Sequence, residues 1–243
     1  MKKFHVRQGP FNFAGLFFSL VGFILVILCL LGCQSPNSRA LYFAKVTNAG
    51  PPVDGKPVAV YYGWQGYCIE EAELTCFSDR SVMVVPFDVS ISTQLNESYP
   101  YLFTDPVTQD ESLNPESTPT PAHDPKIYPA AVLCLLTSAT LLVFCFMRVC
   151  TPQRYQDEYY TRGFLAAGSA VLALLLLVLS SIMYQNAIEE LNLEYPHLVA
   201  TQGPAMTMVG VSFAAYSLAS YVLLRGCMSM ESGGSGTEGY SPI

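Results

Sequence analysis

Four long apolar runs without a charged side chain constrain the fold of this chain more than any other feature. In the 243-residue sequence they cover residues 13–31, 127–147, 163–184 and 204–224. A bilayer core about 30 Å thick needs about 20 helical residues, and every run has that length. Because backbone hydrogen bonds must be satisfied within hydrocarbon, such runs predict helices. The sequence predicts a four-pass membrane protein with spans at 13–33, 127–148, 163–184 and 204–225.

The distribution of charge predicts how the spans are oriented. Basic residues cluster before the first span and between the second and third: Lys2, Lys3, Arg7, Arg148, Arg154 and Arg162. The segment between the third and fourth spans has no Lys or Arg and carries Glu189, Glu190 and Glu194. Short loops rich in Lys and Arg stay on the cytoplasmic side. We therefore expect cytoplasmic termini (1–12 and 226–243), a cytoplasmic loop at 149–162, and outer loops at 34–126 and 185–203 of a plasma-membrane protein.

The first apolar run has an alternative interpretation as a cleaved signal peptide. Leu30-Leu31-Gly32-Cys33 resembles a bacterial lipoprotein cleavage box, and Lys2 and Lys3 precede the run. However, the run exceeds the usual apolar region of such peptides, about 7–15 residues. Its removal would leave three spans and place the arginine-bearing loop outside, against the positive-inside rule. We therefore favour a retained span.

The long segment 34–126 divides into two parts. Residues 40–92 contain four short segments rich in β-branched or aromatic residues, separated by turn signals, at 41–46, 58–62, 74–77 and 82–85. They predict a small antiparallel β-sheet. Residues 105–125 combine prolines with Asp, Glu, Ser and Thr, which predicts a disordered or extended tether. The predicted fold class is an all-α membrane protein with a small extracellular antiparallel β-sheet domain.

Two cysteines and one sequon lie in this segment. Cys68 and Cys76, with seven residues between them, favour a disulfide in an oxidising compartment. Such a bridge would stabilise the hairpin by about 2–3 kcal/mol; two free thiols are the alternative. Zinc is disfavoured because no second cysteine pair or histidine accompanies them. Asn96 begins the single Asn-x-Ser/Thr sequon, which is either glycosylated or unused.

Acidic residues in the outer loops allow weak calcium contacts. Glu70, Glu71 and Glu73 lie between the two cysteines, and Glu189 and Glu190 follow the third span. Oxygen ligands suit Ca²⁺, and extracellular sites can be as weak as about 10⁻⁴–10⁻³ M. A solvated acidic face is the alternative that such charge runs favour. We treat extracellular Ca²⁺ as a speculative ligand of these residues.

Catalysis and ion conduction find little support in the sequence. The apolar runs lack the ionisable residues that mark ion pathways. His5, His123 and His197 share no metal-ligand spacing, and there is no nucleophile elbow. There is also no phosphate-binding glycine loop and no basic nucleic-acid patch. We therefore expect no enzyme, no cofactor and no nucleic-acid partner.

Small residues at four-residue spacing occur on several predicted spans. The pairs are Gly15 and Ser19, Ala166 and Ala170, Gly210 and Ala214, and Ala215 and Ala219. Small side chains let helices approach closely in a membrane. We expect most of these pairs to pack within the protein and a minority to serve lateral association with like chains.

The run Tyr-Gly-Trp-Gln-Gly-Tyr-Cys at 62–68, followed by Cys76, carries a family resemblance. A four-pass protein whose first outer loop has Gly63, Trp64 and Gly66 before Cys68 resembles the claudin superfamily. Claudins usually add an upstream tryptophan in this loop, which this chain lacks, so fungal claudin-like proteins match better. The sequences at 31–35, 183–187 and 203–206 add to the similarity. The chain most resembles the fungal mating-induced calcium regulator and membrane-fusion family.

The resemblance implies both a fold and a function. It implies a left-handed four-helix transmembrane bundle with an outer β-sheet stapled by Cys68 and Cys76. It also implies plasma-membrane residence, a role in low-affinity calcium uptake during the pheromone response, and a role in fusion of mating cells. Related fungal branches organise plasma-membrane domains or act in ambient-pH sensing, which is the alternative function. The expected partners are membrane lipid, like chains, and other membrane proteins such as calcium channel subunits.

Overall fold

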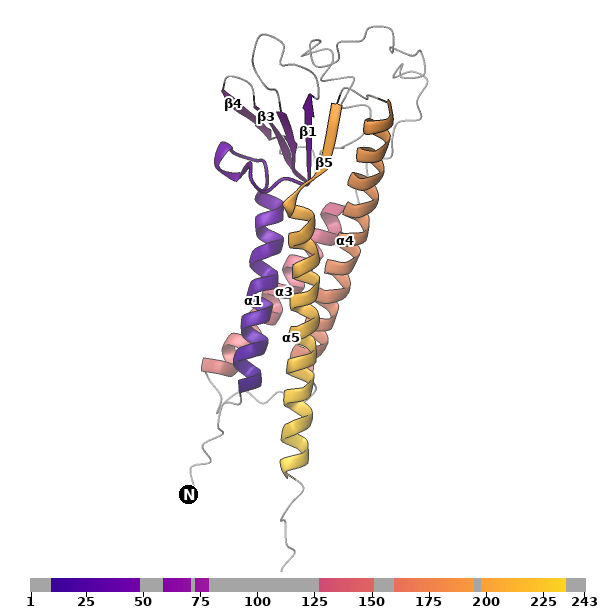
Figure 1. The fold of residues 1–243 in the computed structure, drawn as a ribbon. Coiled ribbons are helices and arrows are strands. Elements are labelled where there is room, and N and C mark those ends of the chain that lie inside the picture. Colours follow the sequence, from indigo (N-terminus) through magenta and orange to yellow (C-terminus); the bar gives the residue numbers. More distant parts are fainter. Residues whose placement is uncertain are drawn as a thin grey trace, which may run out of the picture. The chain divides into compact units, whose positions relative to one another are not determined.

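The structure is a computed structural model that describes residues 10–48, 59–70, 73–78, 127–150, 160–194 and 198–234. These residues are mostly helical, with one small antiparallel sheet (Figure 1). The elements follow in the order α1 (Pro10–Leu31), η1 (Pro36–Ser38), β1 (Ala44–Asn48), β2 (Ala59–Tyr62), β3 (Gly66–Glu70), β4 (Leu74–Ser78), α3 (Ile127–Cys150), α4 (Thr161–Glu194), β5 (Leu198–Gln202) and α5 (Pro204–Gly234).

The four long helices are long and apolar enough to cross a membrane. Their candidate spans are Phe11–Leu31, Pro129–Cys150, Thr161–Leu193 and Pro204–Arg225. Large apolar side chains on these helices remain exposed, among them Phe17, Phe146, Phe164 and Val171. Outward-facing apolar side chains suit hydrocarbon surroundings better than water. The length and composition of these helices confirm the prediction of a multi-pass membrane protein.

Helix α4 is longer than the sequence predicted. It extends to Glu194, ten residues beyond the expected end at Tyr184, and begins at Thr161. The apolar run stops at residue 184, but Ala, Glu and Leu in the following segment are good helix formers, so the helix continues. Arg162, which we expected in a loop, lies instead in the first turn of α4. It is only 4% exposed and donates a hydrogen bond to Asn12 Oδ1 at 3.0 Å.

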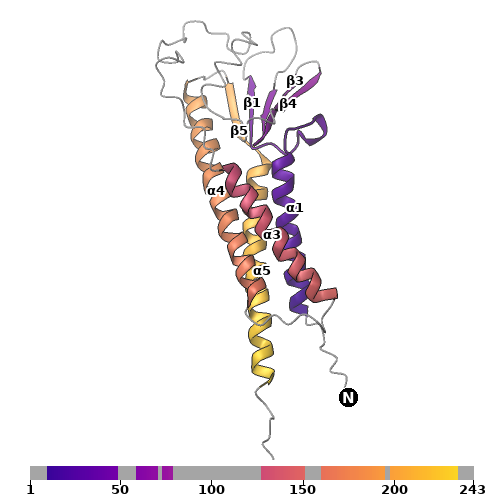
Figure 2. The ribbon, with the colours of Figure 1, turned by 180° about the vertical axis from the view of Figure 1, so that it is seen from behind.

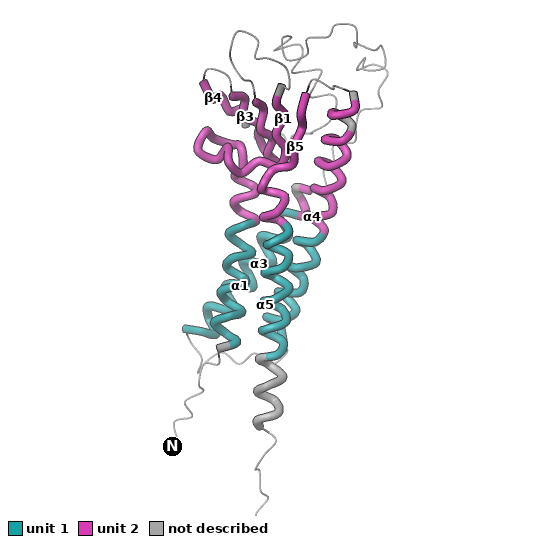
Figure 3. The backbone as a smooth tube through the Cα atoms, in the orientation of Figure 1, with its two compact units in different colours: residues 1–25, 131–174, 210–243 teal, residues 26–130, 175–209 magenta. Residues whose placement is uncertain are grey.

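The chain forms two compact units (Figure 3). Unit 1 comprises residues 1–25, 131–174 and 210–243, and unit 2 comprises residues 26–130 and 175–209. Unit 1 contains segments of all four long helices. Within it, α3 runs beside α4 (Figure 2), and Ser169 Oγ of α4 donates a hydrogen bond to Thr137 Oγ1 of α3 at 3.3 Å. Because each hydroxyl is on a different helix, this bond ties the two helices together inside an apolar environment.

Glycines let α5 approach α1 and α4 closely in unit 1. A Cβ added to Gly22 would lie 2.8 Å from the Tyr216 ring, and one added to Gly15 would overlap Leu223. On α4, a Cβ added to Gly163 would overlap the Leu224 side chain in the same way. Most of the predicted small residues are also buried, namely Ser19, Ala166, Ala170, Ala215 and Ala219, whereas Ala214 is exposed. Small residues on α1 and α4 therefore form the spaces that α5 side chains fill.

Unit 2 contains a five-stranded sheet in the order β4-β3-β2-β1-β5, with every neighbouring pair antiparallel. Strands β1 to β4 come from the segment between α1 and α3, and β5 comes from the segment between α4 and α5. The sequence did not predict β3 or β5. Strand β3 holds Gly66, Tyr67 and Cys68, the end of the run at 62–68. The predicted strand at 82–85 and the tether at 105–125 lie outside the described residues.

We predict that Gly22→Ala destabilises the protein by about 1–3 kcal/mol, because the new methyl group overlaps the buried Tyr216 ring. The free energy of unfolding in detergent, followed by helical circular dichroism, measures the change. Gly168→Ala on α4 is the matched control, since a Cβ added there meets no atom within 4 Å. Equal effects of the two substitutions would contradict the close approach of α1 and α5.

Candidate functional site

The two faces of the sheet differ in chemistry. The register places Lys45, Tyr61, Cys68, Cys76 and Thr201 beside one another across the five strands, so they share one face. The opposite face is apolar and buried, with Ala44, Val46, Val60, Tyr62, Ile69, Leu198 and Ala200. Because charged groups and both cysteines lie on the first face, that face is the candidate functional site.

A disulfide joins β3 to the edge strand β4 on this face, as the sequence predicted. Cys68 on β3 and Cys76 on β4 are directly opposite each other, with their Cα atoms 4.0 Å apart, and they are bonded. Cys68 is buried, and Cys76 is partly exposed. The bridge closes a short hairpin and stabilises it by about 2–3 kcal/mol in the chain-entropy description.

A compact segment, residues 33–42, which we call the strap, connects α1 to β1. Cys33 has a φ angle of 57°, a left-handed conformation that turns the chain out of the helix. Ser35 and Ser38 then form a reciprocal capping box around η1. The Cys33 and Leu41 amides both donate to the Ser38 carbonyl, at 3.2 and 3.0 Å. These local hydrogen bonds give the strap a defined conformation.

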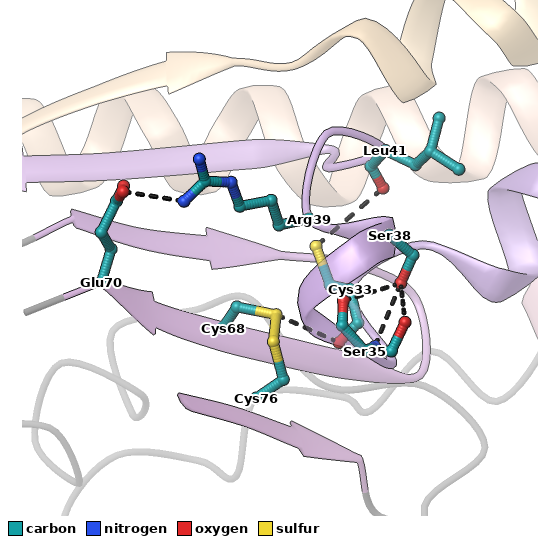
Figure 4. Close-up of a disulfide and its surroundings, with 8 residues drawn as sticks. All are labelled: Cys33, Ser35, Ser38, Arg39, Leu41, Cys68, Glu70 and Cys76. Carbon is teal, nitrogen blue, oxygen red and sulfur yellow. Dashed lines mark hydrogen bonds and ion pairs between the residues drawn. A yellow bond between two sulfur atoms is a disulfide. The ribbon is translucent and has the colours of Figure 1, made fainter. Parts of the chain in front are cut away.

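The strap lies against the disulfide (Figure 4). Cys33 forms one buried cluster with Ala59, Tyr61 and Cys68, and the carbonyl oxygen of Cys33 lies 3.5 Å from Cys68 Sγ. The Cys33 side chain itself is fully buried. Burial raises the pKa of the Cys33 thiol to about 12, because the thiolate would be poorly solvated there. Cys33 is therefore an inert thiol at neutral pH.

An ion pair joins the strap to the sheet. Arg39 Nη1 lies 2.8 Å from Glu70 Oε1, and the Tyr61 hydroxyl donates to Glu70 Oε2 at 2.6 Å. The hydrogen bond from Tyr61, with support from Arg39, lowers the pKa of the Glu70 carboxyl. Burial and the neighbouring carboxylate raise the pKa of Tyr61 to about 12. Lys45 Nζ lies 5.2 Å from the centre of the same Tyr61 ring.

The residues proposed for calcium have separate surroundings in the structure. Both carboxylate oxygens of Glu70 already have protein partners, whereas Glu73 and Glu189 are exposed. Glu71 and the side chain of Glu190 lie outside the described part of the chain, as does the sequon residue Asn96. Within the described ranges, no group of three or more His, Cys, Asp or Glu residues could hold a metal ion. A weak calcium contact stays a prediction.

Gly63 and Trp64, in the motif at 62–68, lie in the turn between β2 and β3. The Phe43 ring stacks against Trp64 on one side and Tyr184 on the other, with centroid distances of 4.7 and 5.1 Å. The Tyr184 hydroxyl donates to the Gly63 carbonyl at 3.1 Å. Gly63 also donates its amide to the carbonyl of Gly66 at 2.8 Å. The motif thus anchors the sheet to α4, and a Cβ at Gly63 would overlap the Gly32 carbonyl.

Three of the residues that fix this site were not identified from the sequence. Phe43 and Tyr184 complete the aromatic stack, and Asn192 of α4 binds the middle of β5. The Asn192 amide donates to the Ala200 carbonyl at 3.1 Å and accepts from the Ala200 amide at 2.7 Å. The position of Tyr184 at the end of an apolar run was a usable signal, because tyrosines concentrate at membrane interfaces. The role of Asn192 had no sequence signal.

We predict that Asn192→Ala destabilises the protein by about 1–3 kcal/mol, because it leaves both backbone groups of the buried Ala200 without their side-chain partner. Denaturant unfolding in detergent measures the loss. Asn186→Ala, an exposed position on the same helix, serves as the control. A loss no greater than that of the control would contradict the role assigned to Asn192.

The lowered pKa of Glu70 predicts an acid-dependent stability. Ionised Glu70 stabilises the folded protein above its ordinary pKa of 4.5, and this contribution is lost as the pH falls through the lower pKa of the folded state. Tyr61→Phe removes the main hydrogen bond that lowers this pKa. The variant should therefore lose the contribution at a higher pH than the wild type, as measured by thermal midpoints between about pH 3 and 7. Overlapping pH profiles would contradict the role of Tyr61.

A comparison with protein-family models finds no model that matches this chain, and a search of curated proteins finds no match either. Function is therefore inferred from the geometry of the sheet and the strap, together with the likeness of residues 62–68 to fungal claudin-like proteins.

Proposed function

We propose that this chain is a non-enzymatic plasma-membrane protein that promotes cell fusion during mating and regulates low-affinity calcium influx. One observation carries the proposal: a single disulfide-bonded sheet combines strands from two separate links, the one between α1 and α3 and the one between α4 and α5. A rigid sheet held by buried aromatic rings presents a fixed surface, which suits recognition of another molecule. The resemblance of residues 62–68 and Cys76 to the fungal fusion family supplies the biological setting.

The sheet face against which the strap lies, which we call the strap face, has a chemistry that supports recognition over catalysis. Glu70 is engaged by Arg39 and Tyr61, and the Cys33 thiol stays protonated at neutral pH. Glu70 and Cys33 therefore have structural roles, since the Glu70 carboxylate is held by Arg39 and Tyr61 and the Cys33 thiol is buried. Surfaces that combine tyrosine and arginine are typical of protein interfaces. The strap face is accordingly a contact surface for a protein partner.

The sheet faces the outside of the cell in this proposal. A disulfide persists in an oxidising environment, and Cys68 and Cys76 are bonded. Arg148 lies in the last turn of α3, Arg162 lies in the first turn of α4, and Arg225 is the last residue of the candidate span in α5. These are the helix ends that do not lead into strands of the sheet. Placing them in the cytoplasm satisfies the positive-inside rule and gives cytoplasmic termini.

Calcium influx is regulated through another membrane protein. The central parts of the spans carry no charged side chain, whereas ion pathways usually have ionisable residues facing them. The chain therefore acts as an accessory subunit or organiser beside a calcium channel, with membrane lipid around it. Weak binding of extracellular Ca²⁺ at exposed acids such as Glu73 and Glu189 is compatible with this role.

A second candidate function is the organisation of membrane domains, or an accessory role in pH signalling. Gly168 on α4 and Ala214 on α5 are small, exposed positions, and a Cβ added to Gly168 meets no other atom within 4 Å. Small outward-facing residues let helices of neighbouring chains approach closely in a membrane. Lateral self-association through such positions would suit an organiser.

We predict that cells lacking this protein lose pheromone-induced calcium uptake and fuse poorly during mating. Wild type should restore both, whereas Cys68→Ser combined with Cys76→Ser should restore them poorly at normal surface expression, because the hairpin is no longer cross-linked. Cys150→Ser replaces an exposed free cysteine at the end of α3 and is the matched control. Radioactive calcium uptake and counts of fused mating pairs are the measurements.

Two outcomes would contradict the proposed function. Normal uptake and fusion in the deletion strain would exclude both roles and favour the membrane-organiser alternative. Full restoration by the double cysteine variant would exclude the cross-linked sheet as the active part. A change in the distribution of plasma-membrane domain markers in the deletion strain would then identify the organiser function.

A further inference from the structure

The strap covers one sulfur of the disulfide more completely than the other. Cys68 has no exposed surface, and its Sγ lies under the Cys33 carbonyl oxygen at 3.5 Å (Figure 4). Tyr42 and Leu74 pack against the same cluster. Cys76, on the other side of the bond, is partly exposed. A reagent in water can therefore reach Cys76 more easily than Cys68.

Side-chain contacts hold the strap to the sheet at three places. Near α1, Gln34 donates a hydrogen bond to Gln65 Oε1, in the turn between β2 and β3, at 2.5 Å. At the other end of the strap, the Tyr42 ring packs edge-on against the Tyr61 ring, with centroids 5.2 Å apart. Beyond η1, Arg39 pairs with Glu70 at 2.8 Å, and their side chains are 46% and 36% exposed. Exposed ion pairs contribute little to global stability. The Arg39–Glu70 contact can therefore open while the hydrogen bonds between the strands remain.

We propose that the strap is a gate on the reduction of the Cys68–Cys76 disulfide, and that the Arg39–Glu70 ion pair is its latch. With the latch closed, the disulfide resists external thiols. With the latch open, the strap moves off Cys68 and reduction is faster. This role is independent of the partner or process that the sheet serves.

The reduction requires an external dithiol and proceeds in two exchanges. A thiolate of the dithiol attacks Cys76 Sγ, which forms a mixed disulfide and breaks the bond to Cys68. Cys68 Sγ leaves as a thiolate and takes a proton from water. The second thiol of the reductant then attacks the mixed disulfide and releases Cys76. Two electrons and two protons pass to the protein, and the dithiol becomes a cyclic disulfide.

The strap slows this reaction by destabilising the leaving group. A thiolate on Cys68 would form in an apolar cluster with no exposed surface, beneath the strap and beside a carbonyl oxygen. The pKa of Cys33 in the same cluster is raised to about 12 by burial, which shows how poorly this environment accepts a thiolate. Thiols of higher pKa leave more slowly. Opening the strap admits water to Cys68 and removes this penalty.

The rate of disulfide reduction in the full-length protein tests the gate. Purified protein in detergent is treated with dithiothreitol at neutral pH, and alkylated Cys68 and Cys76 are counted over time by mass spectrometry. Glu70→Gln and Arg39→Gln should each accelerate reduction by roughly three- to tenfold, because they remove the charge-assisted contact. Glu73→Gln, which neutralises an exposed acid immediately before β4 of the same hairpin, is the matched control. It should keep the wild-type rate.

A charge exchange separates the latch from a general effect of charge. The double variant Arg39→Glu with Glu70→Arg restores an opposite-charge pair and should restore the slow rate. Wild-type rates in both single variants, with unchanged helical content, would overturn the proposal. Equal acceleration by Glu73→Gln would overturn it as well. If Glu70→Gln does not fold, Arg39→Gln alone decides, since its exposed side chain can be replaced without burying a new group.

Discussion

The pairing of β1 with β5 is the contact on which unit 2 depends. It joins Ala44–Asn48 to Leu198–Gln202, two segments about 150 residues apart in the sequence, through five opposed residue pairs. Without it, β5 would have no neighbour among the described strands, and the segment between α4 and α5 would be a plain connection. Asn192 reinforces the arrangement by binding the backbone of Ala200 from α4. Because the Asn192 side-chain amide binds both the carbonyl and the amide of Ala200, it also hinders another strand from pairing with this edge of the sheet.

The aromatic stack and the strap hold the sheet in place within unit 2. Phe43 lies between Trp64 and Tyr184, so rings from three chain segments share one buried contact. The strap packs Cys33 against Cys68 on the face that carries the disulfide, and it brings Arg39 to Glu70. The stack therefore anchors the turn between β2 and β3 to α4, and the strap places a group of charges beside the disulfide.

Close helix packing in unit 1 has a different physical basis. Burial of leucine gains little in lipid, so contact depends on shape. Tyr216, Leu223 and Leu224 of α5 fill spaces that glycines leave on α1 and α4. Buried hydroxyls such as Ser19 bond to their own helix backbone, here to the Gly15 carbonyl at 2.7 Å, and so avoid an unsatisfied group in an apolar interior.

The four spans, a small sheet and the Cys68–Cys76 bridge were predictable from the sequence, because span length, segments rich in β-branched or aromatic residues, and cysteine spacing are local signals. The extension of α4 to Glu194 also has a local cause in its good helix formers, although we did not predict it. In contrast, the pairing of β5 with β1 and the hydrogen bond from Tyr184 to Gly63 were not predictable, because each depends on a partner far along the chain. The ion pair between Arg39 and Glu70 was also not predictable, because nothing in the sequence indicates that these two residues are neighbours.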